Sequence, residues 1–115
     1  MANPVVHFEV IGKDGDKARE FYSKIFGWQM QVMPEMNYGM VDNGGHGING
    51  GVGGGDQAHA MFYVEVPDLQ ATLDQVEKNG GKTVMPVTEI PGAVTLATFT
   101  DADGNLVGLV KAGTM

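Results

Sequence analysis

The sequence predicts an α+β fold made of two similar modules, each with the order strand, helix, strand, strand, strand. Three observations support this prediction. Residues 6–11 (VHFEVI) are echoed by residues 62–67 (FYVEVP). A helical pattern follows each copy and ends at a glycine, Gly27 in the first and Gly81 in the second. Three strand-like runs then follow each glycine, and such internal repetition indicates one structural unit used twice.

The first module is expected to span about residues 4–54. Residues 5–11 are rich in Val, Ile and Phe and alternate in polarity, which is typical of a strand. Asp14 or Asp16 can cap the following helix, which ends at Gly27. An apolar stripe is predicted on that helix at Ala18, Phe21, Tyr22, Ile25 and Phe26. Strands are expected at residues 28–33, 38–41 and 48–52.

The second module, about residues 59–112, repeats the same order. A strand is predicted at residues 61–66, followed by a helix that begins at 67–68 and closes at 79–81. The inner stripe of this helix is expected at Leu69, Thr72, Leu73 and Val76. Further strands are expected at residues 82–89, 93–100 and 105–111, joined by turns at 91–92 and 103–104. Residues 1–115 thus form a single predicted domain, and the three strand runs between residues 28 and 52 argue against a ferredoxin-like dimeric barrel.

Composition narrows the class of protein. The net charge is −7, with only seven Lys and Arg residues and no basic cluster, which argues against nucleic acid or an anionic membrane as a partner. The absence of cysteine excludes disulfides and thiolate zinc sites. No basic start is joined to a long apolar run, so a cytoplasmic protein is expected.

Several short motifs occur in a characteristic order: residues 7–10 (HFEV), 18–22 (AREFY), 26–28 (FGW), 66–68 (VPD), 80–82 (GGK) and 101–105 (DADGN). With this order and spacing, essentially the whole chain resembles the vicinal oxygen chelate superfamily. That superfamily includes glyoxalase I, bleomycin-resistance proteins and extradiol dioxygenases, and the chain looks most like its small glyoxalase-like members. The resemblance implies curved mixed sheets around a cleft with the helices outside, and a homodimer.

The resemblance also implies a divalent metal site, with one ligand on the first and one on the last strand of each module. His7 fits the first ligand position. The other positions fall on Tyr63, on Gly108 and on Gly50 or a near neighbour, where the superfamily's metal enzymes carry His, Gln or Glu. A lone neutral imidazole does not hold a catalytic ion in water. We therefore predict no metal and no other cofactor.

Strand alternation predicts which side chains face the cleft, because residues two apart share a face. In the first module His7 and Glu9 would face it, while Phe8 and Val10 pack under the helix.

In the second module Tyr63 and Glu65 would face the cleft, and Phe62, Val64 and Val66 would pack. His7, Glu9, Tyr63 and Glu65 would then form an acid–base set, or alternatively a structural hydrogen-bond network.

The predicted pocket has an apolar floor of Trp28, Tyr38 and Met40, although a tryptophan just after a helix is also typical of a core. Gly50 and Gly108 would leave room beside the polar residues. Eight of the twelve residues from 44 to 55 are glycine, which suggests a flexible approach to the cleft or a strand thinned for a ligand.

Two classes of function follow. One is a metal-independent, glyoxalase-like lyase or isomerase that acts on a small oxygenated molecule, with Glu9 as base and His7 as acid. The other is a binding protein that sequesters a ligand without chemistry, as bleomycin-resistance proteins do. A third, a metal-dependent lyase or dioxygenase, requires that one ligand position has been misaligned.

Overall fold

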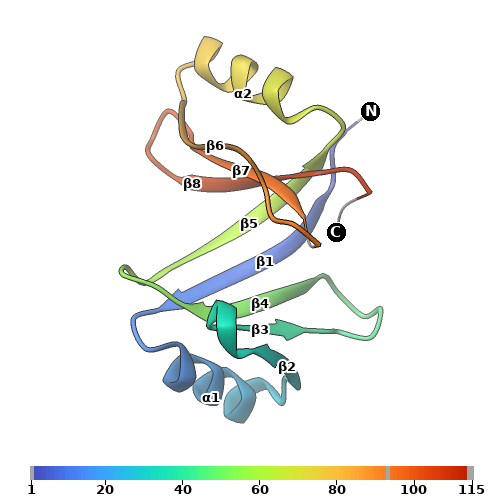
Figure 1. Cartoon of the computed structure of the whole chain (residues 1–115), viewed down its shortest axis with the longest axis vertical. Coiled ribbons are helices and arrows are strands. Elements are labelled where there is room, and N and C mark those ends of the chain that lie inside the picture. Colours follow the sequence, from blue (N-terminus) through green and yellow to red (C-terminus); the bar gives the residue numbers. More distant parts are fainter. Residues whose placement is uncertain (1, 93, 114–115) are drawn as a thin grey trace. The chain divides into compact units, whose positions relative to one another are not determined.

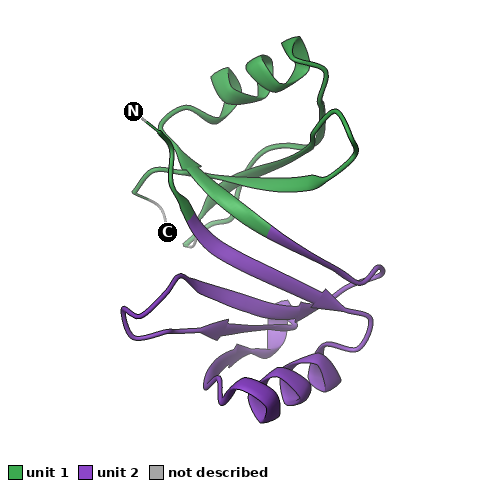
Figure 2. Ribbon diagram, turned by 180° about the vertical axis from the view of Figure 1, so that it is seen from behind, with its two compact units in different colours: residues 1–5, 62–115 green, residues 6–61 purple. Residues whose placement is uncertain are grey.

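The computed structural model of the chain describes residues 2–92 and 94–113. The chain divides into two compact units (Figure 2). We call residues 6–61 the N-terminal unit, and residues 1–5 together with 62–115 the C-terminal unit.

The N-terminal unit contains a sheet with the strand order β2-β3-β4-β1 and one long helix (Figure 1). The β2–β3 and β3–β4 pairs are antiparallel, whereas β4 and β1 are parallel. The elements are β1 (Val5–Gly12), α1 (Gly15–Phe26), β2 (Met30–Met33), the 3-10 helix η1 (Pro34–Met36), β3 (Tyr38–Val41) and β4 (Asn49–Gly54).

Helix α1 begins and ends where the sequence predicts. The Asp14 side chain accepts a hydrogen bond from the Lys17 backbone N–H at 3.1 Å, which satisfies one of the unpaired donors of the first turn. Gly27 adopts a left-handed conformation, with φ of 70°, and its N–H donates to the Ser23 carbonyl.

The predicted apolar stripe of α1 is largely wrong. Phe21, Ile25 and Phe26 are 56%, 59% and 59% exposed, and the buried residues of the helix are Gly15 and Arg19. Arg19 donates a hydrogen bond to the Val52 carbonyl on β4, so its buried side chain lies between the helix and the sheet. The helix is therefore turned so that most of the stripe lies toward solvent.

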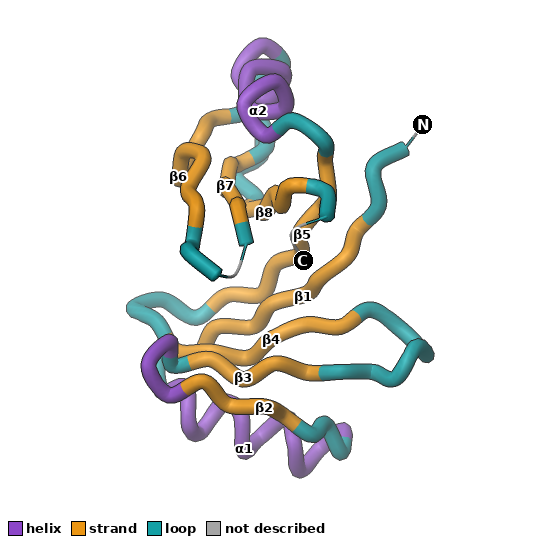
Figure 3. Tube along the Cα trace, turned by 45° about the vertical axis from the view of Figure 1, so that its right-hand side comes forward, coloured by secondary structure: helices purple, strands orange, loops and turns teal. Residues whose placement is uncertain are grey.

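The C-terminal unit has a similar plan, with the strand order β5-β8-β7-β6 and one helix (Figure 3). The β5–β8 pair is parallel and the other two pairs are antiparallel, as in the N-terminal unit. Residue 93, the expected first residue of the strand that becomes β7, lies outside the described residues. The elements are β5 (His59–Val66), α2 (Leu69–Lys78), β6 (Lys82–Glu89), β7 (Thr95–Thr100) and β8 (Leu106–Lys111).

The core of the C-terminal unit lies between α2 and its sheet. Leu69 and Leu73 of the predicted inner stripe are 4% and 2% exposed. Phe62 is 43% exposed, so the prediction that it packs like Val64 and Val66 is wrong. The buried cluster consists of Val66, Leu69, Leu73, Ala97 and Leu109, with Val64 and Phe99 packed against it.

Neither helix of the described ranges is long and apolar enough to cross a membrane.

Alanine substitutions in the two helices should differ strongly in their effect on the free energy of unfolding. Leu73→Ala should lower the free energy of unfolding by about 2–5 kcal/mol, because it leaves a cavity in a packed core. Ile25→Ala should change it by less than about 0.5 kcal/mol, because the side chain is already exposed. Urea unfolding followed by circular dichroism measures both values. A large loss for Ile25→Ala would mean that the predicted stripe is the packed face after all.

Candidate functional site

The site begins with a buried histidine on β1. His7 is 3% exposed, and its Nε2 lies 2.9 Å from the Tyr38 hydroxyl at the start of β3. The two rings are nearly parallel, with centroids 6.4 Å apart and an interplanar angle of 16°. An imidazole and a phenol are thus joined by a hydrogen bond across a sheet in which β4 lies between their strands.

Two glycines of β4 allow Tyr38 to reach His7. Gly53 is the register partner of Tyr38, and a Cβ built on Gly53 would lie 2.7 Å from Tyr38 Cδ1. A Cβ built on Gly51 would overlap the ring and hydroxyl of the same tyrosine. The Tyr38 ring therefore lies flat over β4, in space that any larger residue would fill. The space over these glycines is occupied by the protein's own Tyr38 ring. This corrects the expectation that the strand lacks side chains in order to admit a ligand.

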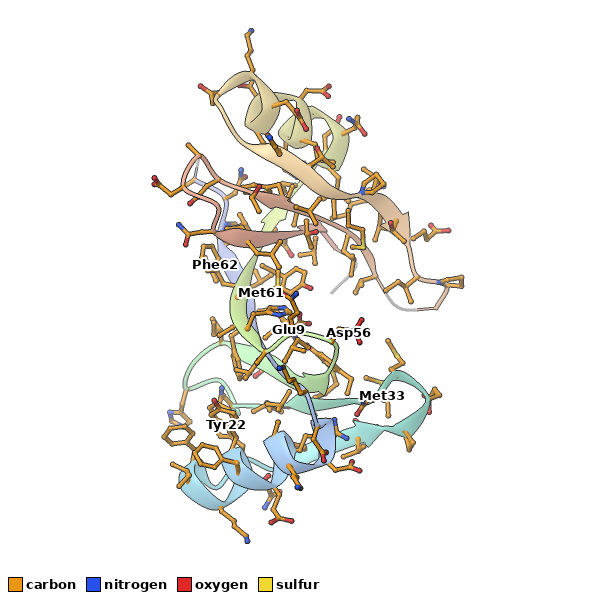
Figure 4. All side chains as sticks on the ribbon, turned by 90° about the vertical axis from the view of Figure 1, so that its left-hand side faces the viewer. Glu9, Tyr22, Met33, Asp56, Met61 and Phe62 are labelled. Atoms are coloured by element: carbon orange, nitrogen blue, oxygen red, sulfur yellow. The ribbon has the colours of Figure 1, made fainter. Side chains whose placement is uncertain are left out.

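The opposite face of the same strand is also covered by an aromatic ring. A Cβ built on Gly50 would overlap the Phe8 ring, and Phe8 lies 5.1 Å from Trp28 between ring centroids. Trp28 in turn stacks on Tyr22 of α1 at 5.7 Å, and Tyr22 lies on the α1 side of the unit (Figure 4). The prediction that Phe8 packs on the helix side is confirmed. Gly50 and Trp28 are on that side too. The prediction that Gly50 lies beside His7 is therefore wrong, and of the two alternatives for Trp28 the ring contacts favour the packed one.

Burial sets the charge state of the imidazole. Desolvation lowers the pKa of His7 below its ordinary value of 6.5. The ring is therefore neutral near pH 7, with one nitrogen that donates and one that accepts.

A hollow of about 520 Å³ lies at the edge of the same sheet. Met40 lines it and follows Tyr38 by two residues on β3, so their side chains share a face. Asn49 also lines it and is the register partner of His7. The full lining consists of Gln29, Met30, Gln31, Met40, Val41, Asp42 and Asn49.

The remaining predicted residues divide between the two units. Glu9 is half-buried on β1, and its register partner is Gly51. In the C-terminal unit Tyr63 is 7% exposed, and its ring covers Gly108, its partner on β8. Glu65 pairs with Val110, and its backbone N–H donates to the Pro4 carbonyl at 2.9 Å. The Tyr63 ring therefore occupies the space over Gly108, which was expected to be open. That His7, Glu9, Tyr63 and Glu65 lie close together stays a prediction.

Sequence reasoning missed the role of Tyr38 and the polar lining of the hollow. Tyr38 was expected only as an apolar floor, yet its hydroxyl is the partner of His7. Asn49 and Gln31 were not singled out. The signal for Tyr38 was present: glycines at 51 and 53, two apart, leave one face of a strand bare for a neighbouring ring.

The sequence model of the Glyoxalase/Bleomycin resistance protein/Dioxygenase superfamily matches residues 5–109. The chain belongs to this superfamily. It is 32% identical over 108 residues to a "Glyoxylase-like domain-containing protein" of Didymella fabae, covering 84% of each chain. It is 29% identical over 109 residues to "Putative glyoxylase CFP32" of Mycobacterium bovis, covering 86% of this chain but only 42% of that protein.

Solved structures of the superfamily share the fold. A glyoxalase/bleomycin resistance protein/dioxygenase superfamily member from Vibrio splendidus matches with a TM-score of 0.68 at 15% identity, covering 96% of this chain and 99% of that one. Methylmalonyl-CoA epimerase from Mycobacterium tuberculosis matches with a TM-score of 0.65 at 17% identity, covering 93% and 86%. The predicted α+β fold of the superfamily is confirmed.

The residues at the superfamily's metal positions do not fit a metal ion. Gly108 offers no side-chain donor, Gly50 faces the helix side of β4, and Nε2 of His7 is hydrogen-bonded to Tyr38. The Tyr63 ring fills the space where a side chain at position 108 would lie. In the described ranges 2–92 and 94–113, no three His, Cys, Asp or Glu side chains group so that they could hold a metal ion.

Gly51→Ala should displace Tyr38 from His7, because the added methyl group overlaps the phenol ring. We expect a loss of about 1–3 kcal/mol in the free energy of unfolding, as for an overpacked core. Two-dimensional NMR should also show shifted His7 ring signals. Gly47→Ala is the matched control, since nothing lies within 4 Å of its Cβ. Equal effects of the two variants would contradict the close fit of Tyr38 on β4.

His7 should make the protein less stable in acid. The unfolded chain binds the proton with a pKa near the ordinary 6.5, whereas the native pKa is lower. The stabilisation is therefore complete above 6.5 and is lost as the pH falls through the native pKa. Urea unfolding at about pH 7.5 and about pH 5 should show a smaller acid-induced loss in His7→Gln than in the wild type. His59→Gln, at an exposed site, should behave like the wild type.

Proposed function

We propose that the protein binds a small oxygenated molecule on the strand face that carries His7 and Tyr38, and that it does so without a metal ion. The observation that carries this proposal is the 2.9 Å hydrogen bond between His7 Nε2 and the Tyr38 hydroxyl. A phenol can accept one hydrogen bond and donate another. In the tautomer in which Nε2 donates to the phenol oxygen, the phenol can donate its own proton to a ligand oxygen.

Tyr38, rather than His7, is the group that contacts the ligand in this proposal. His7 is 3% exposed, whereas Tyr38 is half-buried at the start of β3. The hollow at the edge of the sheet, which is lined by neither His7 nor Tyr38, offers the thioether of Met40, which adapts to irregular apolar shapes. Gln31 and Asn49 add amide groups that donate to and accept from oxygen functions. This combination suits a small molecule with carbonyl or hydroxyl groups and some apolar surface.

An enzymatic version of the proposal needs a base as well as the imidazole–phenol pair. Glu9 lies two residues from His7 on β1, so strand alternation places both side chains on one face. In a lyase or isomerase, Glu9 would take a proton from the ligand, while the Tyr38 hydroxyl, oriented by His7, would donate a hydrogen bond to the ligand oxygen on which negative charge develops. The glyoxylase-like names of the relatives from Didymella fabae and Mycobacterium bovis support this class of chemistry.

Sequestration without chemistry is the second candidate. The hollow favours it, because Asp42 is the one charged side chain among the described residues that line it, and methionines supply much of its apolar wall. A surface of this kind binds without offering several acid–base groups to one ligand. The homodimer and the cytoplasmic location expected from the sequence stay predictions.

Tyr38→Phe tests the proposal directly. The probe is a set of small α-oxo and α-hydroxy carbonyl compounds, titrated while amide signals are followed by NMR. We expect Tyr38→Phe to weaken binding by roughly tenfold, the effect of one lost hydrogen bond to a polar ligand. Tyr22→Phe, on the α1 side of the sheet, should bind like the wild type.

The same titration separates the alternatives. Chelator treatment should leave binding unchanged, and elemental analysis of protein purified without chelator should find no stoichiometric ion. Ligand recovered unaltered would favour sequestration, whereas proton exchange or a product would favour the enzyme. A bound ion at full occupancy, or equal affinity for Tyr38→Phe and the wild type, would overturn the proposal.

A further inference from the structure

The two units differ sharply at one position of their helices. Arg19 and Leu73 each lie eight residues before the glycine at the end of their helix, Gly27 or Gly81. Each is buried, at 7% and 2% exposure. Leu73 packs in an apolar cluster, as a residue at this position of a two-layer fold ordinarily does. The N-terminal unit places a cation there instead.

Burial of an arginine is costly unless its guanidinium is fully hydrogen-bonded, so its presence calls for a specific reason. Arg19 Nη1 donates to the Val52 carbonyl of β4 at 3.3 Å. Nη2 donates to Asp16 Oδ1 at 2.7 Å and to Asn37 Oδ1 at 3.1 Å. The Asp16 side chain is 94% exposed, so this ion pair is screened by water and adds little. The contacts with β4 and with Asn37 are the ones that distinguish this helix from α2.

Both chain neighbours of Tyr38 touch Arg19. Asn37 accepts from its guanidinium, and Asn37 is in a left-handed conformation, with φ of 51°. The Asn37 carbonyl also accepts from the Gly54 N–H at 3.0 Å, which ties this turn to β4. On the other side, a Cβ built on Gly39 would lie 2.8 Å from Arg19 Cδ. The arginine stem thus lies directly under the backbone on one side of Tyr38, and its guanidinium donates to the Asn37 side chain on the other.

We propose that Arg19 is a positioning residue: from the helix side of the sheet it fixes the start of β3, so that the Tyr38 hydroxyl on the opposite face meets His7 Nε2. A hydrogen bond of 2.9 Å is lost when the atoms separate by more than about half an ångström, so the backbone at Tyr38 must be held closely. A flexible leucine offers no such hold on Asn37. The consequence of this positioning for ligand binding rests on the proposed function, but the positioning by Arg19 does not.

Arg19→Leu is the decisive variant, because it installs the residue that the C-terminal unit already uses. Because Asp16 is exposed, the substitution leaves no buried charge unpaired, and its cost is limited to the acceptors on Val52 and Asn37 that lose a donor, so the fold should survive. The readout is the titration of the His7 ring by NMR in the absence of any ligand, with the His7 signals assigned from His7→Gln. We expect the His7 pKa to rise toward its ordinary value, because a displaced Tyr38 ring admits water to the imidazole.

Further variants make the test specific. Tyr38→Ala removes both the ring and its hydrogen bond, and Arg19→Leu combined with Tyr38→Ala should show no greater change in the His7 titration than Tyr38→Ala alone. Asn37→Gly removes the side-chain acceptor while allowing the same positive φ, and should act in the direction of Arg19→Leu. Asp16→Asn is the control, and should leave the titration unchanged.

The outcome separates this inference from the proposed function. An Arg19→Leu protein with the melting temperature and His7 titration of the wild type overturns the positioning role, whatever the protein binds. Reduced thermal stability with an unchanged titration would also overturn it, since Arg19 would then be a structural group only. Should Arg19→Leu not fold, Arg19→Lys keeps the charge and loses the planar fork, and the same titration applies. A shifted titration without binding of the carbonyl probes would support Arg19 positioning and count against the proposed function.

Discussion

The packing of the N-terminal unit depends on the glycine-rich strand β4, which presents few side chains to its neighbours. β4 lies between β1 and β3, and its glycines leave both of its faces without side chains at the points of contact. The Phe8 ring fills one face over Gly50, and the Tyr38 ring fills the other over Gly51 and Gly53. Only because β4 is bare can a phenol rooted on β3 hydrogen-bond an imidazole rooted on β1. Each glycine costs up to about 1 kcal/mol in chain entropy, which the burial of two aromatic rings offsets.

The C-terminal unit also packs an aromatic ring over a glycine of a neighbouring strand. Its Tyr63 ring lies over Gly108 on the neighbouring strand, just as Tyr38 lies over β4. Beneath α2, however, an apolar cluster centred on Leu73 stabilises the unit by burial alone. Beneath α1 the corresponding position is Arg19, and the buried contacts there are polar and directional. The two units therefore differ in how the helix packs on its sheet, α2 through apolar burial and α1 through the hydrogen bonds of Arg19.

Local signals in the sequence predicted the order of elements well. The aspartate cap of α1, its terminal glycine and the strand β1 each depend on a few neighbouring residues, and the structure confirms them. The errors arose where a distant residue decides. The helix α1 turns Arg19 toward the sheet, where it hydrogen-bonds the Val52 carbonyl of β4. The periodicity of Phe21 and Ile25 could not reveal that this side of the helix, and not theirs, is buried. Gly50 was placed on the wrong face because a shift of one residue reverses every side chain of a strand, and a run of glycines carries no pattern to fix it.

Among the described residues, more than missing side-chain donors separates this chain from a metal site. In a metal site of this superfamily, the first-strand imidazole would direct a nitrogen lone pair at the ion, and the last-strand position would supply an oxygen. Here Nε2 of His7 is engaged by Tyr38, and a side chain at position 108 would collide with the Tyr63 ring. A change of Gly108 to glutamate therefore restores nothing by itself, because the tyrosine that fills its space would have to move first. At position 108 an aromatic ring takes the volume that a ligand side chain would need, and in the N-terminal unit the first-strand imidazole is paired with a phenol instead.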